Sequence, residues 1–232
     1  MNSNPKAVLI TGANARIGLE LAKESLVLGY QAIIHFRSSS EPAMSIFKDD
    51  QRVRFLQGEL TDNPERFIAS ALQMPLKIEG LINNASVFNE GDLRNPEHLK
   101  RTLDVNLMVP VRLSSEFAKS VNKGWIINII DAHIDQFNPK FQNYRISKKF
   151  LREMTRQQAH LFAPTIRVNG IAPGAILPAE HDSDERFKLL AKNIPLRKTG
   201  SVENIRQAYK FLVENDYVTG SIIEVAGGWQ LV

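Results

Sequence analysis

Short runs of apolar residues alternate along the chain with segments in which apolar side chains recur at helical spacing. In residues 17–28, apolar side chains stand at positions 17, 21, 22, 26 and 28, which places most of them on one face of a helix. The runs predict strands at residues 7–11, 31–36, 53–56, 80–82, 125–130, 167–171 and 221–225. Helices are predicted at residues 17–28, 63–72, 97–120, 143–161 and 203–213, with Pro110 kinking or interrupting the third.

The order of these elements predicts the fold class. Strands alternate with helices, and the strands are apolar on both faces, which is typical of a parallel sheet covered by helices on each side. Linker composition and internal repeats are absent, so residues 1–232 are expected to form one doubly wound α/β domain. Two long irregular stretches, residues 132–142 and 173–200, each follow a strand, where ligands bind in such folds.

Composition and charge exclude several classes of protein. The chain has 29 basic and 25 acidic residues, which gives a net charge of +4, but the bases are scattered among acids rather than gathered in the stripe of a nucleic-acid binder. The absence of cysteine excludes disulfides, cysteine metal sites and thiol catalysis. The chain has no apolar run long enough to span a membrane and no secretory signal at residues 1–6, so a cytoplasmic protein is expected.

The histidines give little indication of chemistry. They are His35, His98, His133, His160 and His181. Their spacings match no metal-ligand pattern, so no metal site is predicted. His181 lies in the stretch 173–200, where it is either a surface residue or a minor contributor to substrate binding.

The turn after the first strand is a candidate phosphate-binding site. It reads Thr11-Gly12-Ala13-Asn14-Ala15-Arg16-Ile17-Gly18 and leads into the first helix. A strand, a turn of small residues and a helix N-terminus together offer backbone N–H groups to a pyrophosphate. The middle glycine of the usual G-x-G-x-x-G fingerprint is missing, and Arg16 supplies a cation instead. A plain strand–helix connection is the alternative.

The end of the second strand indicates which dinucleotide would bind. Sites for the unphosphorylated cofactor carry an acid there. Here the segment contains His35, Arg37 and Ser38, and the first acid is Glu41. A guanidinium with neighbouring hydroxyl groups suits a 2′-phosphate, which favours NADPH over NADH. An ordinary polar loop is the alternative.

Tyr144 and Lys148 are four residues apart at the start of a long predicted helix, so they share a face. A lysine ammonium beside a phenol stabilises the phenolate and is expected to lower the pKa of Tyr144. A tyrosine tuned in this way can give or take a proton. Taken alone, the pair is more typical of a solvated helix surface.

These motifs, in this order and spacing, resemble the short-chain dehydrogenase/reductase family along essentially the whole chain. The matching residues are Thr11-Gly12…Gly18, Asn83-Asn84-Ala85, Asn106, Tyr144…Lys148, Pro173-Gly174 and Gly227-Gly228. The resemblance implies a Rossmann-type fold, a nicotinamide cofactor, and hydride transfer assisted by Tyr144. It also implies a homotetramer built on the helices around Pro110 and Phe150.

The resemblance assigns roles to individual residues as well. Lys148 would bind the nicotinamide ribose and tune Tyr144, and Asn106 would hold the water of a proton relay. Glu59-Leu60 stands where most relatives have an aspartate that contacts adenine. The remaining implied contacts with the cofactor are Gly12, Arg16, Ile17, Gly18, Asn84, Ala85, Ser86, Tyr144, Pro173, Gly174 and Ile176.

One departure from the family pattern narrows the choice of substrate. Asp131, thirteen residues before Tyr144, stands where the family usually has a serine. A serine donates a hydrogen bond to a carbonyl, whereas a carboxylate does so only when protonated. Asp131 therefore disfavours ketones and suits a substrate rich in N–H groups or an imine nitrogen that needs a proton. A structural cap or an ion pair is the alternative role.

Asp131 together with Arg16 resembles the pteridine reductase branch of the family, which includes bacterial dihydromonapterin and dihydrofolate reductases. Residues 83–88 and 176–182 match this branch as well. In that branch a phenylalanine covers the pterin ring, a role that carries over to Phe88, with core packing as the alternative. Ser86 and Arg16 would contact cofactor phosphate and pterin.

Three hypotheses follow. The first is an NADPH-dependent reductase of dihydropterins, with Asp131, Tyr144, Lys148 and Asn106 as catalytic residues and a small-molecule pterin or folate as substrate. The second keeps the enzyme class but takes a carbonyl substrate such as a 3-oxoacyl thioester. The third is a non-catalytic NADP(H)-sensing protein, which would have no need of the Tyr144–Lys148 pair.

Overall fold

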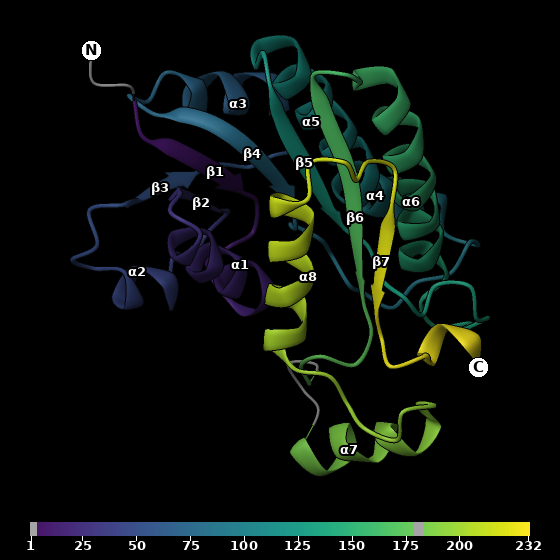
Figure 1. Ribbon diagram of the computed structural model, residues 1–232. Helices are drawn as coiled ribbons and strands as arrows, with labels where there is room; N and C mark the ends of the chain where they lie inside the picture. Colours follow the sequence, from purple (N-terminus) through teal and green to yellow (C-terminus); the bar gives the residue numbers. More distant parts are fainter. Residues whose placement is uncertain (1–3, 179–182) are drawn as a thin grey trace.

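The computed structural model describes residues 4–178 and 183–232. All seven described strands pair in parallel in one sheet of order β3-β2-β1-β4-β5-β6-β7 (Figure 1). Their bounds are β1 Lys6–Ile10, β2 Gln31–Phe36, β3 Val53–Gln57, β4 Lys77–Asn83, β5 Gly124–Ile129, β6 Ile166–Pro173 and β7 Ile222–Val225. The predicted doubly wound α/β fold is confirmed.

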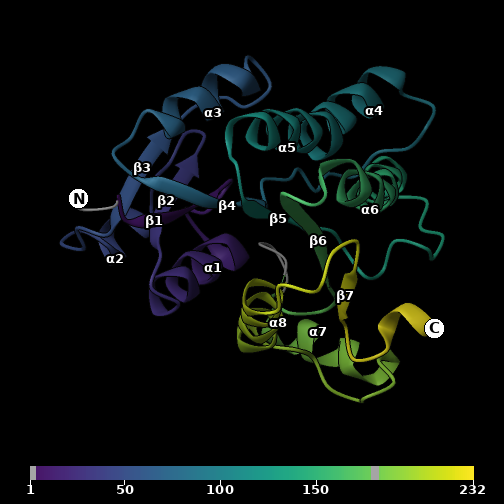
Figure 2. The same cartoon turned by 45° about the horizontal axis from the view of Figure 1, so that its top comes forward.

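Helices cover both faces of this sheet (Figure 2). Their bounds are α1 Arg16–Val27, α2 Ala43–Ile46, α3 Pro64–Leu72, α4 Pro96–Leu103, α5 Val109–Ser120, α6 Gln142–Phe162, α7 Asp184–Leu189 and α8 Val202–Glu214, with short 3₁₀ turns at Leu190–Asn193 and Trp229–Leu231. α3 and α4 begin alike: an Asn side chain at the cap, Asn63 or Asn95, accepts a backbone N–H three residues on, and a proline follows.

The core consists of two apolar layers, one on each face of the sheet. One layer joins Ile10, Ile34 and Ile82 of the strands to α1 and α8, and the other joins Leu9 and Leu81 to α3, α5 and α6. Neighbouring residues of one strand thus face opposite layers, which is why the strands read as continuous apolar runs. Each such side chain contributes about 1.5–3 kcal/mol on burial.

The predicted helix 97–120 is interrupted, as expected, near Pro110. A π-helical segment, Asp104–Met108, separates α4 from α5. Pro110 has no N–H to give to the carbonyl of Asn106 four residues earlier, and its ring would clash with that carbonyl in a regular α-helix. The wider π turn relieves the clash, and such segments often occur at functional sites.

Because all the strands are parallel, the loops that follow them lie at the same end of the sheet. β1 lies between β2 and β4, so the chain continues from β1 to β2 on one side and from β4 to β5 on the other. Ligands of open α/β sheets bind at this switch point, outside the carboxyl ends of the strands.

Within residues 4–178 and 183–232, every helix falls short of the length or the hydropathy that a membrane span requires.

Candidate functional site

The turns that follow β1 and β4 are joined by hydrogen bonds at the switch point. The Asn84 side-chain amide donates to the carbonyls of Thr11, at 2.9 Å, and Gly12, at 2.8 Å. The Thr11 hydroxyl oxygen accepts the backbone N–H groups of Asn84 and Ala85. Gly12 has a φ of +60°, and a Cβ there would stand 2.9 Å from the Ala85 Cα. The β1 turn is therefore held rigidly in an open form.

This turn fits a pyrophosphate. Ala15 caps α1 without a side-chain hydrogen bond, and the first turn carries no acid. The free N–H groups and the positive end of the helix dipole are thus available to an anion. Gly18 packs so closely that a Cβ would lie 2.6 Å from the Gly12 carbonyl oxygen. The half-buried Ile17 packs against the core from the same turn.

Arg16, which begins α1, points away from this turn in the structure. Its guanidinium donates to the carbonyl oxygen of Pro178 at 2.7 Å, and its φ is +55°. Arg16 therefore connects the phosphate turn to the stretch that follows β6. Its predicted contacts with cofactor and pterin stay predictions.

His35 supports the turn from below rather than presenting its ring to a ligand. It is 3% exposed, its Nδ1 accepts the Gly12 N–H at 3.0 Å, and its Nε2 lies 3.0 Å from the Gly58 carbonyl oxygen. The Nε2 therefore carries the proton, and burial lowers the pKa of His35. The expected direct contact with the cofactor is corrected: the ring has no free edge, and His35 acts through Gly12.

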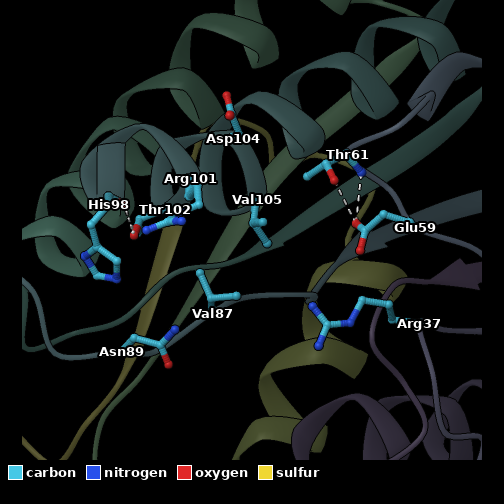
Figure 3. A pocket seen from close by; sticks show the side chains of 10 residues that line it. All are labelled: Arg37, Glu59, Thr61, Val87, Asn89, His98, Arg101, Thr102, Asp104 and Val105. Atoms are coloured by element: carbon cyan, nitrogen blue, oxygen red, sulfur yellow. Dashed lines mark hydrogen bonds between the residues drawn. The ribbon is translucent and has the colours of Figure 1, made fainter. Parts of the chain in front are cut away.

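A cavity of about 440 Å³ opens beyond the ends of β2, β3 and β4, next to α4 (Figure 3). Arg37 and Glu59 line one end and Val105 another part of the wall. The Arg37 guanidinium faces the cavity and has no hydrogen bond or ion pair within the described residues. Glu59 is held by Thr61, whose N–H and hydroxyl both donate to it. The expected contact of Arg37 with a 2′-phosphate stays a prediction.

Other predicted residues around this cavity have different places. Ser38 is exposed beside Arg37. Leu60 is 6% exposed and packs in the core, so its side chain is structural. Burial raises the pKa of Glu59, but hydrogen bonds from Thr61 and the nearby Arg37 outweigh it and hold that pKa below its usual value. Glu59 is therefore ionised at neutral pH.

Asp131 and Tyr144 form the centre of the second half of the site. Asp131 follows β5 and Tyr144 lies in the first turn of α6, and the tyrosine hydroxyl donates to Asp131 Oδ2 at 3.0 Å. The other carboxylate oxygen accepts the His133 N–H at 2.6 Å. The predicted pairing of positions 131 and 144 is thus present as a direct hydrogen bond.

The expected direction of the Tyr144 pKa is wrong. Burial raises this pKa well above 10, and the charge of Asp131 raises it further, because both disfavour a phenolate. The Lys148 ammonium lies 5.9 Å from the centroid of the Tyr144 ring and bonds elsewhere. Tyr144 therefore holds its proton firmly.

Lys148 is buried beneath this pair. Its Nζ donates to the Ile129 carbonyl oxygen at 2.8 Å, and burial lowers the pKa of Lys148 to about 8. Burial has the opposite effect on the acidic Asp131: it raises the pKa of the carboxyl, although the hydrogen bonds from His133 and Tyr144 act to lower that pKa. The site thus combines a carboxyl and a phenol whose pKa values are both raised with a lysine whose pKa is lowered to about 8.

Asn106, in the π-helical segment, uses its whole side chain to hold neighbouring elements. Its amide donates to the Val87 carbonyl and the Ser147 hydroxyl, both at 3.0 Å. Its oxygen accepts from the Val87 N–H and the Ser86 hydroxyl. A water held by this side chain would have to displace one of these partners, so the predicted relay water fits only the backbone carbonyl, which Pro110 cannot bond.

Phe88 lies above Tyr144 as an open aromatic surface. It is 54% exposed, so it is not a core residue. One face stacks on Phe141, with ring centroids 4.5 Å apart and planes 5° apart, and Tyr144 meets it edge-on at 4.7 Å. Phe141 was not predicted from the sequence, because only the fold brings the two loops together.

The stretch after β6 packs against the end of β7, where the Gly174 N–H donates to the Val225 carbonyl at 3.0 Å. Pro173 ends β6, and Gly174 packs so tightly that a Cβ would lie 2.8 Å from Ala226. Ile176 is 5% exposed. α7 forms part of the predicted substrate loop 173–200. Residues 179–182, including His181, lie outside the described residues.

The chain is similar to known proteins along nearly its full length. The model of the family named short chain dehydrogenase matches residues 6–188. A dihydromonapterin reductase of Shigella sonnei is 27% identical, with 99% of this chain and 98% of that protein covered. FolM alternative dihydrofolate reductase 1 from Brucella canis, solved with NADP, is 30% identical with a TM-score of 0.91, covering 99% of this chain and 96% of that one.

The chain belongs to the short-chain dehydrogenase family. It is therefore an oxidoreductase of the nicotinamide-cofactor class, as the motifs predicted, and the sensor hypothesis loses its support. A blue fluorescent protein from a metagenomic library, solved with NADPH, is 25% identical with a TM-score of 0.87, and each chain is covered to 99%. The predicted cofactor, NADP(H), is the one that the solved relatives of this short-chain dehydrogenase hold.

Proposed function

We propose that this short-chain dehydrogenase reduces a dihydropterin to the tetrahydro form with NADPH. The observation that carries the proposal is the carboxylate of Asp131, bonded to the Tyr144 hydroxyl in the place where a carbonyl reductase needs a hydrogen-bond donor. A carboxylate accepts hydrogen bonds from the amino-bearing ring of a pterin. The similarity to dihydromonapterin and dihydrofolate reductases supports the same substrate class.

The residues of this chain handle the proton of the reaction. Reduction of a C=N bond adds a hydride to carbon and a proton to nitrogen. NADPH, when bound, supplies the hydride. The Tyr144 hydroxyl donates to Asp131, and burial raises the pKa of both groups, which favours their protonated forms and suits them to pass a proton to the substrate. Lys148 holds its place through the Ile129 carbonyl and would orient the nicotinamide ribose.

The stacked pair of Phe88 and Phe141 supports recognition of a flat heterocycle. Phe141 stacks on one face of Phe88 and Tyr144 meets the ring at nearly a right angle, so the plane of this half-exposed ring is fixed before a ligand binds. A planar ring that stacks there gains burial and aromatic contact without reordering the side chain. Aliphatic thioesters gain less from such a surface.

Purified protein assayed for NADPH consumption tests the proposal. The panel contains dihydromonapterin, dihydrobiopterin, dihydrofolate and acetoacetyl thioester. We expect turnover of at least one of the three pterins and little of the thioester. Thioester turnover with silent pterins would replace this proposal by the carbonyl-reductase hypothesis.

Phe88→Ala is expected to raise the KM for the dihydropterin by about 10- to 100-fold, from lost burial and stacking. The KM for NADPH should stay close to that of the wild type. Phe137→Ala is the matched control, because Phe137 lies in the loop before α6 and is 82% exposed. Equal effects of both substitutions would mean that Phe88 is not the ring contact.

Arg37→Ser is expected to raise the KM for NADPH by about 10- to 100-fold, the range for loss of a hydrogen bond to a charged group. The KM for NADH should change little, because NADH has no 2′-phosphate. Arg54→Ser, an exposed arginine on β3, is the control. If both cofactors weaken equally in Arg37→Ser, the guanidinium does not recognise the 2′-phosphate.

A further inference from the structure

A cluster outside the predicted site residues lies directly against Asp131. The rings of His133 and Trp229 are stacked, with centroids 4.2 Å apart and planes 14° apart. The Arg145 guanidinium lies 3.3 Å from His133 Nδ1. These side chains come from the loop after β5, from α6 and from the turn Trp229–Leu231 beyond β7 (Figure 1). Three distant parts of the chain thus meet beside one carboxylate.

The cluster controls one of the two hydrogen bonds that fix Asp131. Tyr144 holds Oδ2 from a long, regular helix, so its place is determined by the backbone of α6. His133 holds Oδ1 from an irregular loop, where no ladder of backbone hydrogen bonds fixes its N–H. The neighbouring Ala132 N–H is bonded to the Pro173 carbonyl at 2.9 Å, and the contacts of the His133 side chain supply the remaining support for the His133 N–H.

Trp229 is itself well anchored. It packs against a small apolar cluster whose members include Ala132 and Ala226. The backbone N–H of Trp229 donates to the Ala226 carbonyl at 3.1 Å. The two preceding glycines have φ values of +63° and +87°, and a Cβ on Gly228 would stand 3.1 Å from Pro195. This double glycine directs the Trp229 ring onto His133.

We propose that Trp229 and His133 are positioning residues for Asp131: the stacked pair keeps the His133 N–H on Oδ1 and so aims the carboxylate at the substrate. The effect on turnover rests on the proposed function. The coupling among His133, Trp229 and Asp131 does not, because it is a property of the protein without substrate.

The charges around His133 make this coupling measurable. The charged groups facing its ring are Asp131 on its own loop and Arg145 on α6, and Trp229 adds an uncharged face. Burial and Arg145 lower the pKa of His133, while Asp131 opposes them. The ring is therefore neutral at neutral pH and accepts from Arg145 through Nδ1. Coupling between two sites is reciprocal, so a change at Asp131 must move the titration of His133.

Trp229 fluorescence reads that titration without any substrate. The chain has two tryptophans, so Trp125→Phe leaves Trp229 as the sole reporter. We expect its emission to fall as the stacked imidazole gains a proton at acidic pH. Adding His133→Asn should abolish the transition, and adding Asp131→Asn should move its midpoint to lower pH. If Asp131→Asn leaves the midpoint of this transition unchanged, the proposal is wrong. If Trp125→Phe does not fold, the difference between wild type and Trp229→Phe gives the same curve.

Kinetics test the consequence for turnover, with whichever substrate the panel identifies. Trp229→Leu should lower kcat by about 10-fold, as expected for a slightly misplaced catalytic group, with little change in KM. Trp229→Phe, which can still stack, should keep most of the kcat. Leu231→Ala is the control, because Leu231 lies in the same turn and is 77% exposed. If Trp229→Leu and Leu231→Ala have equal kcat, the proposal is wrong. If no pterin is turned over but Asp131→Asn still shifts the fluorescence midpoint, only the proposed substrate is wrong.

Discussion

Tyr144→Phe is expected to lower kcat by about 10²- to 10⁴-fold, the range for loss of a positioned proton donor. The substitution removes one hydroxyl, whose partner is Asp131 Oδ2 at 3.0 Å. The KM for NADPH should stay nearly unchanged, because Lys148 and the phosphate turn keep their own hydrogen bonds. Steady-state NADPH consumption and cofactor titration measure the two quantities.

The matched control is Tyr209→Phe. Tyr209 is fully buried, and its hydroxyl lies 2.8 Å from the Ser25 hydroxyl between α8 and α1, away from Asp131 at the end of β5. Its loss should lower the free energy of unfolding by about 1 kcal/mol and leave kcat unchanged. If Tyr144→Phe keeps most of its kcat, the proton comes from another group, and Asp131 becomes the leading candidate.

The interior strands β1, β2, β4, β5 and β6 were predictable because they are buried on both faces, so their apolar runs are a local signal. The polar start of β4 was not predictable, because Lys77 and Glu79 lie outside the apolar run. They form an ion pair with each other, and Glu79 also pairs with Lys6. α7 was missed for a related reason: it has no buried residue, so it carries no apolar stripe. α2 spans four residues, which is too short for periodicity to show.

The candidate site was predictable where motif spacing along one element decides it. Tyr144 and Lys148 share α6, and Gly12 and Gly18 share the β1 turn, so their proximity is local. Phe141 and Trp229 were missed, because their partners Phe88 and His133 come from other loops and only the closed sheet brings them together. No residue pattern near either position signals such a contact.

Electrostatics and side-chain direction were the least predictable features. The sequence places Lys148 near Tyr144 but does not show that the hydroxyl is buried and bonded to Asp131, which together raise its pKa instead of lowering it. His35 stands at the end of β2, where a cofactor contact is plausible from spacing alone. Which way its ring turns depends on Gly12 and Gly58, to which it bonds beneath the turn.

Asp131→Asn is expected to lower kcat/KM for the dihydropterin by about 100-fold, equivalent to about 3 kcal/mol, as for loss of one charged partner in a buried contact. The amide cannot carry a proton as a carboxyl does, and one of its two atoms donates where the carboxylate accepts. The KM for NADPH should be little changed. A variant with wild-type kcat/KM would assign Asp131 a structural role, the alternative that the sequence left open.

The same substitution should change stability in the opposite sense. Burial raises the pKa of Asp131 in the folded state, so the folded protein binds its proton more tightly than the unfolded chain does. The resulting stability is present below the unfolded pKa of about 3.9 and is lost as the pH rises through the folded value. At neutral pH the ionised carboxylate thus destabilises the folded state. Asp131→Asn should therefore melt at a higher temperature than the wild type, and the difference in melting temperature should shrink at acidic pH.

Asp135→Asn is the matched control, with the sign reversed. Asp135 lies in the same loop, and its hydrogen bond with Arg152, at 2.6 Å, lowers its pKa. Its contribution is present above the unfolded pKa and is lost as the pH falls through the folded value, so Asp135→Asn should melt lower than the wild type at neutral pH. Thermal melts of both variants across pH decide the matter. If Asp131→Asn also melts lower at neutral pH, the hydrogen bonds from His133 and Tyr144 outweigh burial, and the carboxyl is held ionised for binding rather than poised to carry a proton.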